Sequence, residues 1–265
     1  MPAPDTRPPT AQKDLDLLCR AAEHAGEIAL QFFRRNPKTW EKPGAGPVTE
    51  ADYAVNTYLA ETLQAARPDY GWLSEETPDS TDRLARDTVF IIDPIDGTRS
   101  FLEGSGSWAH SLAVAHRGQV IAGAVHMPQR GFTFTASLGG GARLNGAPLT
   151  ASPRTALDGA TLLANKFSVA PKYWPNGLPP IKRHYRPSLA YRLGLVAEGR
   201  FDAMLVFRDT WEWDIAAGSL IATEAGASVS DRHGHALRFN TEHPVSSGLI
   251  AGGPSIHDAL MHQLR

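Results

Sequence analysis

Apolar residues recur every three to four positions in two stretches of the first 68 residues, a spacing that predicts two amphipathic helices. The first runs from Asp14 to Arg35, where Asn36-Pro37 stops it. The second starts after Thr49, an expected N-cap with Asp52 three residues later, and continues to Pro68. Between them, the Gly- and Pro-containing stretch from Lys42 to Pro47 predicts a loop.

The middle of the chain changes to short apolar runs separated by turn residues, which predicts strands. Asn145-Gly146 is a strong hairpin signal, because both residues tolerate positive φ. We therefore expect an antiparallel meander. The predicted strands cover residues 87–93, 111–115, 120–126 and 132–136.

The second half alternates between strand-like and helix-like segments. Strands are predicted at residues 160–164, 201–207 and 248–251, and helices at residues 187–198, 213–225 and 255–264. Near Pro153 the architecture changes without a linker. We expect a loose tail over residues 1–12, then one domain over 13–265 with halves 13–152 and 153–265.

Composition and charge narrow the partners. The chain has 265 residues, 42% of them hydrophobic and 20% charged, which is ordinary globular material. A net charge of −2 indicates neither a nucleic-acid polymer nor a membrane as partner, so local cations must attract any anionic substrate. The single cysteine, Cys19, excludes an intrachain disulfide and suits the reducing cytoplasm. No apolar run approaches the ~20 residues of a membrane helix.

Acidic residues stand at the ends of several predicted elements, where side chains from distant segments can converge. Taken singly, each is well explained as a helix cap or a solvated acid. Taken together, they predict a shared acidic site. They are Asp52, Glu75, Glu76, Asp93, Asp96 and Asp214.

The stretch from Phe90 to Thr98 carries the densest chemistry. An apolar run ends in Asp93 and Asp96, and Gly97 and Thr98 follow where a helix can begin. This places hard oxygen ligands beside backbone N–H groups that attract an anion. Metal cations and a phosphate are the expected occupants.

Four blocks in this order resemble the signature of the inositol monophosphatase family, and the resemblance extends from about Leu15 to the C-terminus. They are Val48-Thr49-Glu50-Ala51-Asp52, Ser74-Glu75-Glu76, Asp93-Pro94-Ile95-Asp96-Gly97-Thr98 and Trp213-Asp214-Ile215-Ala216-Ala217-Gly218.

The resemblance implies a magnesium-dependent, lithium-sensitive phosphomonoesterase. It also implies an α/β fold, a layered α-β-α-β-α sandwich with a mostly antiparallel N-terminal sheet and a mixed C-terminal sheet. A homodimer is possible. The substrate would be a small anionic phosphate ester, and two or three Mg²⁺ ions would serve as cofactors.

The same resemblance assigns roles to individual residues. One Mg²⁺ is held by Glu75, Asp93 and the carbonyl of Ile95, and a second by Asp93, Asp96 and Asp214. Thr98, oriented by Asp52 and assisted by Glu75, helps to remove a proton from the attacking water. The substrate contacts Asp96, Gly97, Thr98 and Asp214. Mg²⁺ prefers such oxygen ligands, which agrees with this assignment.

Two neighbouring residues are given lesser roles. Glu76 is expected to support the residues that bind the metal without binding the metal itself. Lys42 falls near a lysine of the family, but different loop lengths shift the register, so we interpret it as a surface cation.

The choice among substrates rests on a few positions. Inositol phosphatases of the family place an acidic residue a few positions before the Trp-Asp block. In this chain, counting forward from Gly199 puts Val206 at that position, and counting back from Asp214 puts Phe207 there. Neither side chain accepts a hydrogen bond, which disfavours inositol. The longer segment from Gly199 to Asp214 resembles the adenosine 3',5'-bisphosphate nucleotidase branch.

Basic and aromatic residues nearby are compatible with that branch. A second phosphate would favour a basic cluster, although ordinary surface arginines are an equal explanation. Trp211 and Trp213 can stack on a base or serve as core anchors. The cluster consists of Arg183, His184, Arg186 and Arg192.

Other readings stay open at this point. Inositol 1-phosphate and histidinol phosphate are alternative substrates. A remote alternative function is a non-catalytic binding module on the same fold. A phosphotransferase is disfavoured, because the run Gly139-Gly140-Gly141 lacks the lysine of a phosphate-binding loop.

Overall fold

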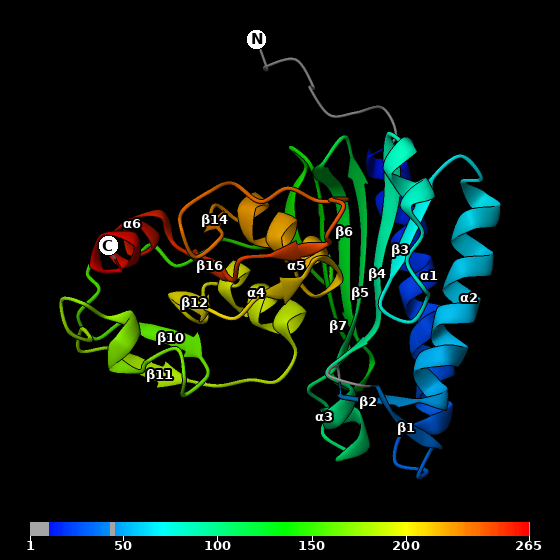
Figure 1. Ribbon diagram of the computed structural model, residues 1–265, viewed down its shortest axis with the longest axis horizontal. Helices are drawn as coiled ribbons and strands as arrows, with labels where there is room; N and C mark the ends of the chain where they lie inside the picture. Colours follow the sequence, from blue (N-terminus) through cyan, green and yellow to red (C-terminus); the bar gives the residue numbers. More distant parts are fainter. Residues whose placement is uncertain (1–10, 43–45, 265) are drawn as a thin grey trace.

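The computed structural model describes residues 11–42 and 46–264, which form five layers, helix, sheet, helix, sheet and helix (Figure 1). Helices α1 and α2 cover the outer face of a large sheet, α4 and α5 lie between this sheet and a smaller one, and α6 covers the far side. The expected layered sandwich is confirmed. The first ten residues of the expected tail lie outside the described residues, and residues 11 and 12 already belong to α1.

The predicted helices form with their ends shifted by one to three residues. Thr49 caps α2, accepting from the backbone N–H groups of Ala51 and Asp52, while the Asp52 carboxylate accepts from the N–H of Thr49. The helices are α1 (Ala11–Phe32), α2 (Glu50–Ala66), α3 (Thr98–Leu102), α4 (Leu189–Ala197), α5 (Glu212–Glu224) and α6 (Pro254–Gln263), with short 3-10 turns η1 (Thr81–Ala85), η2 (Pro128–Arg130) and η3 (Pro171–Tyr173).

The larger sheet has seven strands in the order β3-β4-β5-β6-β7-β8-β9. Its neighbours are antiparallel except β3 and β4, which run parallel, so the predicted meander is confirmed. Asn145-Gly146 forms the last turn, with both residues at positive φ. The strands are β3 (Gly71–Ser74), β4 (Thr88–Asp96), β5 (Ala109–His116), β6 (Gln119–Met127), β7 (Phe132–Ser137), β8 (Gly141–Leu144) and β9 (Ala147–Pro148).

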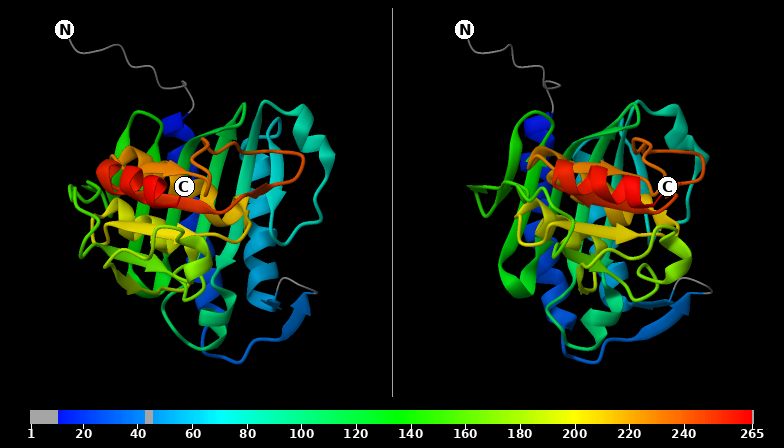
Figure 2. Two further views of the ribbon diagram at one scale, coloured as in Figure 1. Left: turned by 60° about the vertical axis from the view of Figure 1, so that its left-hand side comes forward. Right: turned by 90° about the vertical axis from the view of Figure 1, so that its left-hand side faces the viewer.

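The smaller sheet has five strands in the order β11-β10-β12-β16-β14. Strand β10 is parallel to both neighbours and β16 is antiparallel to both of its own, so the sheet is mixed as expected. It lies in front in the right-hand view of Figure 2, beneath α6. Its strands are β10 (Thr161–Ala164), β11 (Lys182–His184), β12 (Ala203–Val206), β14 (Ser228–Ser230) and β16 (Leu249–Gly252).

Two small strand pairs were missed. The loop expected from Lys42 to Pro47 is wrong at both described ends, because β1 (Thr39–Lys42) and β2 (Gly46–Thr49) pair as an antiparallel hairpin. Near the Trp-Asp block, β13 (Thr210–Trp211) pairs with β15 (Val245–Ser246). Strands this short depend on partners that a local pattern does not reveal.

Helices α4 and α5 explain how the two sheets are held together. Every residue of α4 is buried, as expected for a helix enclosed on all sides. Gly218 of α5 lets the two helices approach, since a Cβ there would lie 2.6 Å from the side chain of Leu193. This packing fixes the N-terminal ends of both helices beside the end of β4.

Candidate active site

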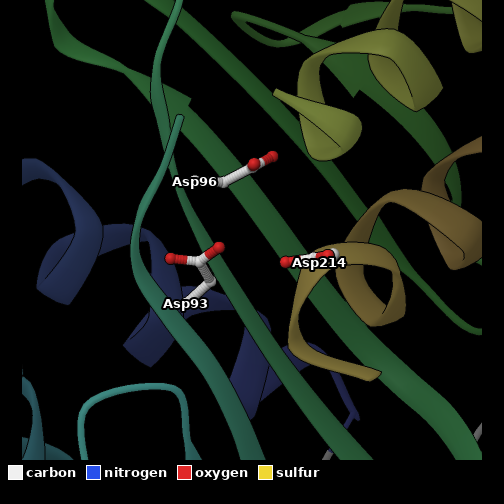
Figure 3. Close-up of side chains that lie close together, drawn as sticks. All are labelled: Asp93, Asp96 and Asp214. Atoms are coloured by element: carbon white, nitrogen blue, oxygen red, sulfur yellow. The ribbon is translucent and has the colours of Figure 1, made fainter. Parts of the chain in front are cut away.

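The end of strand β4 presents two aspartates to one point. The pairing with β5 is regular as far as Asp93, opposite Ser111, and shifts before Asp96, opposite Ala109. Such an irregularity re-aims side chains that would otherwise keep strict alternation. Asp214, in the first turn of α5, faces the same point (Figure 3). One carboxylate oxygen from each aspartate lies within 4.8 Å of the other two.

Helix α5 is tied to the sheet at this point. The hydroxyl of Ser111 on β5 donates to the carbonyl oxygen of Trp213 at 3.0 Å. Because Asp214 follows directly, this bond fixes its distance from β4.

The electrostatics of the three aspartates fit a cation site. Both carboxylate oxygens of Asp93 are buried, and neither has a hydrogen-bond partner within residues 11–42 and 46–264. Burial, followed by repulsion from Glu75, Asp96 and Asp214, raises the pKa of Asp93 well above its ordinary value. A buried carboxylate with no donor is costly unless a cation compensates it. The donor set is purely oxygen, which suits Mg²⁺.

Asp96 is held by the start of α4. Its Oδ2 accepts from the hydroxyl of Ser188 and from the N–H of Ala190, both at 2.7 Å. Burial raises the pKa of Asp96 to about 6 although these two donors oppose the rise. Ser188 has a φ of 62°, a strained conformation for a non-glycine residue, and it also caps α4 through Tyr191.

Asp52 and Thr98 meet, as the resemblance implies. The Thr98 hydroxyl lies 3.3 Å from Oδ1 of Asp52 and 3.2 Å from the carbonyl oxygen of Ile95. Asp52 is buried, and burial raises its pKa to about 7 despite two hydrogen bonds from Thr49. Thr98 is not the N-cap of α3, because Gly97 holds that position at a φ of 101°.

Glu75 and Glu76 both contact Lys42, which we interpreted from the sequence as a surface cation. Lys42 Nζ donates to Oε1 of Glu75 and to Oε1 of Glu76, each at 2.8 Å. The interpretation of Lys42 as a surface cation is therefore wrong, since the hairpin β1–β2 brings it to the site. Burial lowers the pKa of Lys42, but the two glutamates outweigh burial and raise it above the ordinary value.

Glu75 stands somewhat apart from the three aspartates. Its backbone N–H donates to the carbonyl of Ile92, continuing the β3–β4 pairing, and its side chain lines the same cavity as Asp93. It is not part of the close three-aspartate cluster.

A cavity of about 460 Å³ opens above the acids. Glu75, Thr98 and Ile95 line it, as do three cationic side chains that sequence reasoning either missed or saw only in part. These are Arg99, Arg192 and Arg208. Arg192 comes from the predicted basic cluster, but Arg183, His184 and Arg186 do not line the cavity. A chain with a net charge of −2 thus concentrates cations beside its acids.

Val206 and Phe207, the two positions reached by counting from either side, lie in different surroundings. Val206 lines the cavity, whereas Phe207 packs into the core against Tyr173, with ring centroids 4.7 Å apart. An apolar side chain therefore stands in the cavity wall there.

Comparison with known proteins gives consistent matches. The sequence profile of the inositol monophosphatase family matches residues 11–265. Nus factor SuhB of Escherichia coli is 31% identical over 265 residues, covering 95% of each chain. Inositol-1-monophosphatase of Rhizobium meliloti is 32% identical over 261 residues, covering 93% of this chain and 94% of the relative.

Solved structures of related proteins have the same fold. The extragenic suppressor protein suhB of Bartonella henselae superposes with a TM-score of 0.81 at 28% identity, over 96% of this chain and 98% of that one. The IMPase of Thermotoga maritima superposes with a TM-score of 0.81 at 27% identity, over 95% and 96%.

Proposed function

The chain belongs to the inositol monophosphatase family, and from this premise we propose that it removes the 3'-phosphate of adenosine 3',5'-bisphosphate. It is a phosphoric monoester hydrolase of a metal-dependent family, so the proposal concerns which ester it cleaves and how its residues act. The observation that carries the substrate is the cavity wall, which combines Val206 with Arg192 and Arg208 above the three aspartates.

The acids would hold two or three Mg²⁺ ions. Glu75, Asp93 and the carbonyl of Ile95 would hold one, and Asp93, Asp96 and Asp214 another. This assignment is supported by the unpartnered oxygens of Asp93 and by the close approach of the three aspartates. Such cations lower the pKa of water and stabilise negative charge on a leaving oxygen.

Asp52 and Thr98 would handle a proton. In its ionised form, Asp52 can accept the hydrogen bond of the Thr98 hydroxyl, which leaves an oxygen lone pair of Thr98 directed at an attacking water. The substrate phosphate would contact the backbone of Gly97 and Thr98 at the start of α3.

The cavity cations would recognise the second phosphate. Arg192 is nearly buried, which limits its rotamers and reduces the entropy lost on binding an anion. The inositol ring carries no second anionic group to pair with these cations, and it meets an apolar side chain at Val206. Inositol 1-phosphate is the alternative that the similarity to the Rhizobium meliloti enzyme favours.

The test compares four phosphate esters at equal Mg²⁺ concentration, namely adenosine 3',5'-bisphosphate, inositol 1-phosphate, histidinol phosphate and fructose 1,6-bisphosphate. We expect kcat/KM for the adenosine compound to exceed that for inositol 1-phosphate at least tenfold, or about 1.4 kcal/mol. Equal values, or a preference for inositol 1-phosphate or histidinol phosphate, would refute this substrate and leave the phosphatase activity standing.

A further inference from the structure

Two cavities meet at a pair of stacked tryptophans. The indole rings of Trp211 and Trp213 lie 4.7 Å apart with an interplanar angle of 8°. Both line the cavity above the aspartates, and both also line a neighbouring cavity of about 420 Å³. Trp213 is 9% exposed, whereas Trp211 is 43% exposed, so the pair presents its outer ring to solvent.

The outer ring is held in place by its neighbours on the chain. The backbone of Trp211 pairs with Val245 in the β13–β15 ladder. The next residue, Glu212, is buried, and its carboxylate accepts from the N–H of Asn240 at 2.6 Å and from the N–H and hydroxyl of Thr241 at 3.0 and 2.7 Å. The backbone on either side of Trp211 is therefore anchored, and stacking on Trp213 supports the ring while much of its surface stays in water.

Core packing does not account for this arrangement. Trp213 already fills the interior position, and burying a tryptophan gives more stability than leaving it in water. An exposed ring fixed on both flanks beside a reactive cluster is typical of a surface that binds a flat partner. Pro244 and Val245 give the adjoining cavity an apolar wall, which suits the edge of a heterocycle.

We propose that Trp211 is the stacking platform for the aromatic base of the substrate, with Trp213 as the backing ring. This rests on the proposed function, since it supplies the base-recognition element that a nucleotide substrate requires. Stacking is tolerant of base identity, because every base has an aromatic face. Trp211 is thus expected to set the preference for nucleotides over aliphatic esters, without choosing strongly among the bases.

The first test separates base recognition from catalysis. Trp211→Ala and Trp211→Phe are compared with wild type on adenosine 3',5'-bisphosphate and on glycerol 2-phosphate, which has no ring. We expect Trp211→Ala to lower kcat/KM about tenfold or more on the nucleotide, mainly through KM, and less than about twofold on glycerol 2-phosphate. Trp211→Phe should recover most of the loss. Trp40→Ala, which removes a tryptophan of similar exposure on the β1–β2 hairpin, should change neither substrate.

The second test does not depend on turnover. Tryptophan fluorescence is titrated with adenosine 5'-monophosphate and with ribose 5-phosphate, with and without Mg²⁺. We expect adenosine 5'-monophosphate to quench the fluorescence and ribose 5-phosphate to leave it unchanged. This quenching should be retained in Trp40→Ala and lost in Trp211→Ala.

The outcomes distinguish a failure of the Trp211 platform from a failure of the proposed substrate. Equal losses on both substrates, or undiminished quenching in Trp211→Ala, would overturn the platform while phosphate release still supports the phosphatase. If wild type hydrolyses glycerol 2-phosphate but prefers inositol 1-phosphate, the proposed substrate fails, and the fluorescence titration decides the platform by itself.

Discussion

The hydroxyl of Thr98 lies 3.3 Å from Oδ1 of Asp52, although 46 residues separate them in the sequence. Helix α2 delivers the carboxylate and the turn after β4 delivers the hydroxyl. Burial, reinforced by Glu76 and Glu75, raises the pKa of Asp52 to about 7. The ionised form that can accept from Thr98 is therefore lost as the pH falls below neutrality.

The first prediction concerns this pair and pH. We expect kcat/KM to fall as the pH drops through about 7 or somewhat below, since bound cations favour the ionised form of Asp52. Asp52→Asn should lower kcat between about a hundredfold and ten-thousandfold and remove this acidic limb. Glu50→Gln, in the same first turn of α2, is the matched control and should keep the profile. An unchanged acidic limb in Asp52→Asn would assign it to another group.

The second prediction concerns Asp93. Asp93→Asn should reduce kcat/KM on the order of a thousandfold, because it removes the carboxylate shared by the proposed ion sites. It should also raise the thermal stability of the metal-free protein, because burying the Asp93 carboxyl costs free energy whether it stays charged or takes up a proton. In addition, the stabilisation by Mg²⁺ seen in melting curves should shrink.

Asp209→Asn serves as the control for Asp93→Asn, since Asp209 is an exposed partner of Arg232. It should leave activity and Mg²⁺-dependent stabilisation unchanged. Retention of more than about a tenth of kcat/KM by Asp93→Asn would contradict the shared-ligand assignment.

The acidic site could be predicted from the sequence because its signals are local. Asp93 and Asp96 end an apolar strand, and Asp52 and Asp214 lie in first helical turns, so each position follows from its own element. Their convergence required the resemblance, because no periodicity states which element ends meet.

The parts that were missed depend on long-range geometry. Lys42 reaches Glu75 across 33 residues because a hairpin with four-residue strands folds over the site. Ser188 reaches Asp96 across 92 residues from a strained backbone that a local pattern does not reveal. Arg208 lies on the segment between β12 and β13 and lines the cavity. An isolated arginine in the sequence does not indicate such a position.

The third prediction is inhibition by lithium. Li⁺ resembles Mg²⁺ in size but carries half its charge, so it can occupy an oxygen-lined site without supporting turnover. We expect uncompetitive inhibition in the millimolar range, measured on initial rates at several substrate concentrations. Full activity in ~100 mM LiCl, with ionic strength matched by NaCl, would mean that the second ion site is built differently from the family's.

The fourth prediction concerns Glu212, the buried anchor beside Trp211. Glu212→Gln places an amide donor against the donors of Asn240 and Thr241, so we expect a loss of about 1–3 kcal/mol in the free energy of unfolding. The KM for the nucleotide should rise, because the Trp211 platform and Asp214 flank this residue. Urea denaturation and steady-state kinetics measure the two effects.

Glu224→Gln provides a matched control at the other end of α5. Its carboxylate likewise accepts two backbone N–H groups, from Gly139 and Gly141 at 2.8 Å each, but far from the cavity. It should destabilise the protein without changing KM. If both variants alter KM equally, the effect of Glu212 reflects general stability and not positioning.

The last prediction is a pH dependence of stability that comes from His110. This side chain is fully buried, its Nδ1–H donates to the carbonyl oxygen of Pro94, and its Nε2 has no hydrogen-bond partner among the described residues. Burial lowers its pKa from 6.5 to about 3, even though the bond to Pro94 acts in the opposite direction. Since the folded pKa lies below the unfolded one, the unfolded chain binds the proton first. The stabilisation is complete above about pH 6.5 and is lost as the pH falls towards 3.

Between pH 8 and pH 5 this single group should remove about 2 kcal/mol from the free energy of unfolding. His110→Gln keeps a donor for Pro94 but does not titrate, so its stability should fall less over the same interval. Urea midpoints at pH 8 and pH 5 measure the difference, and His262→Gln, an exposed histidine in the last turn of α6, is the control that should behave as wild type. Both proteins keep the same buried aspartates, so the difference between the two slopes reports on His110. Equal slopes would show that His110 titrates in the folded protein with a pKa close to its ordinary value of 6.5.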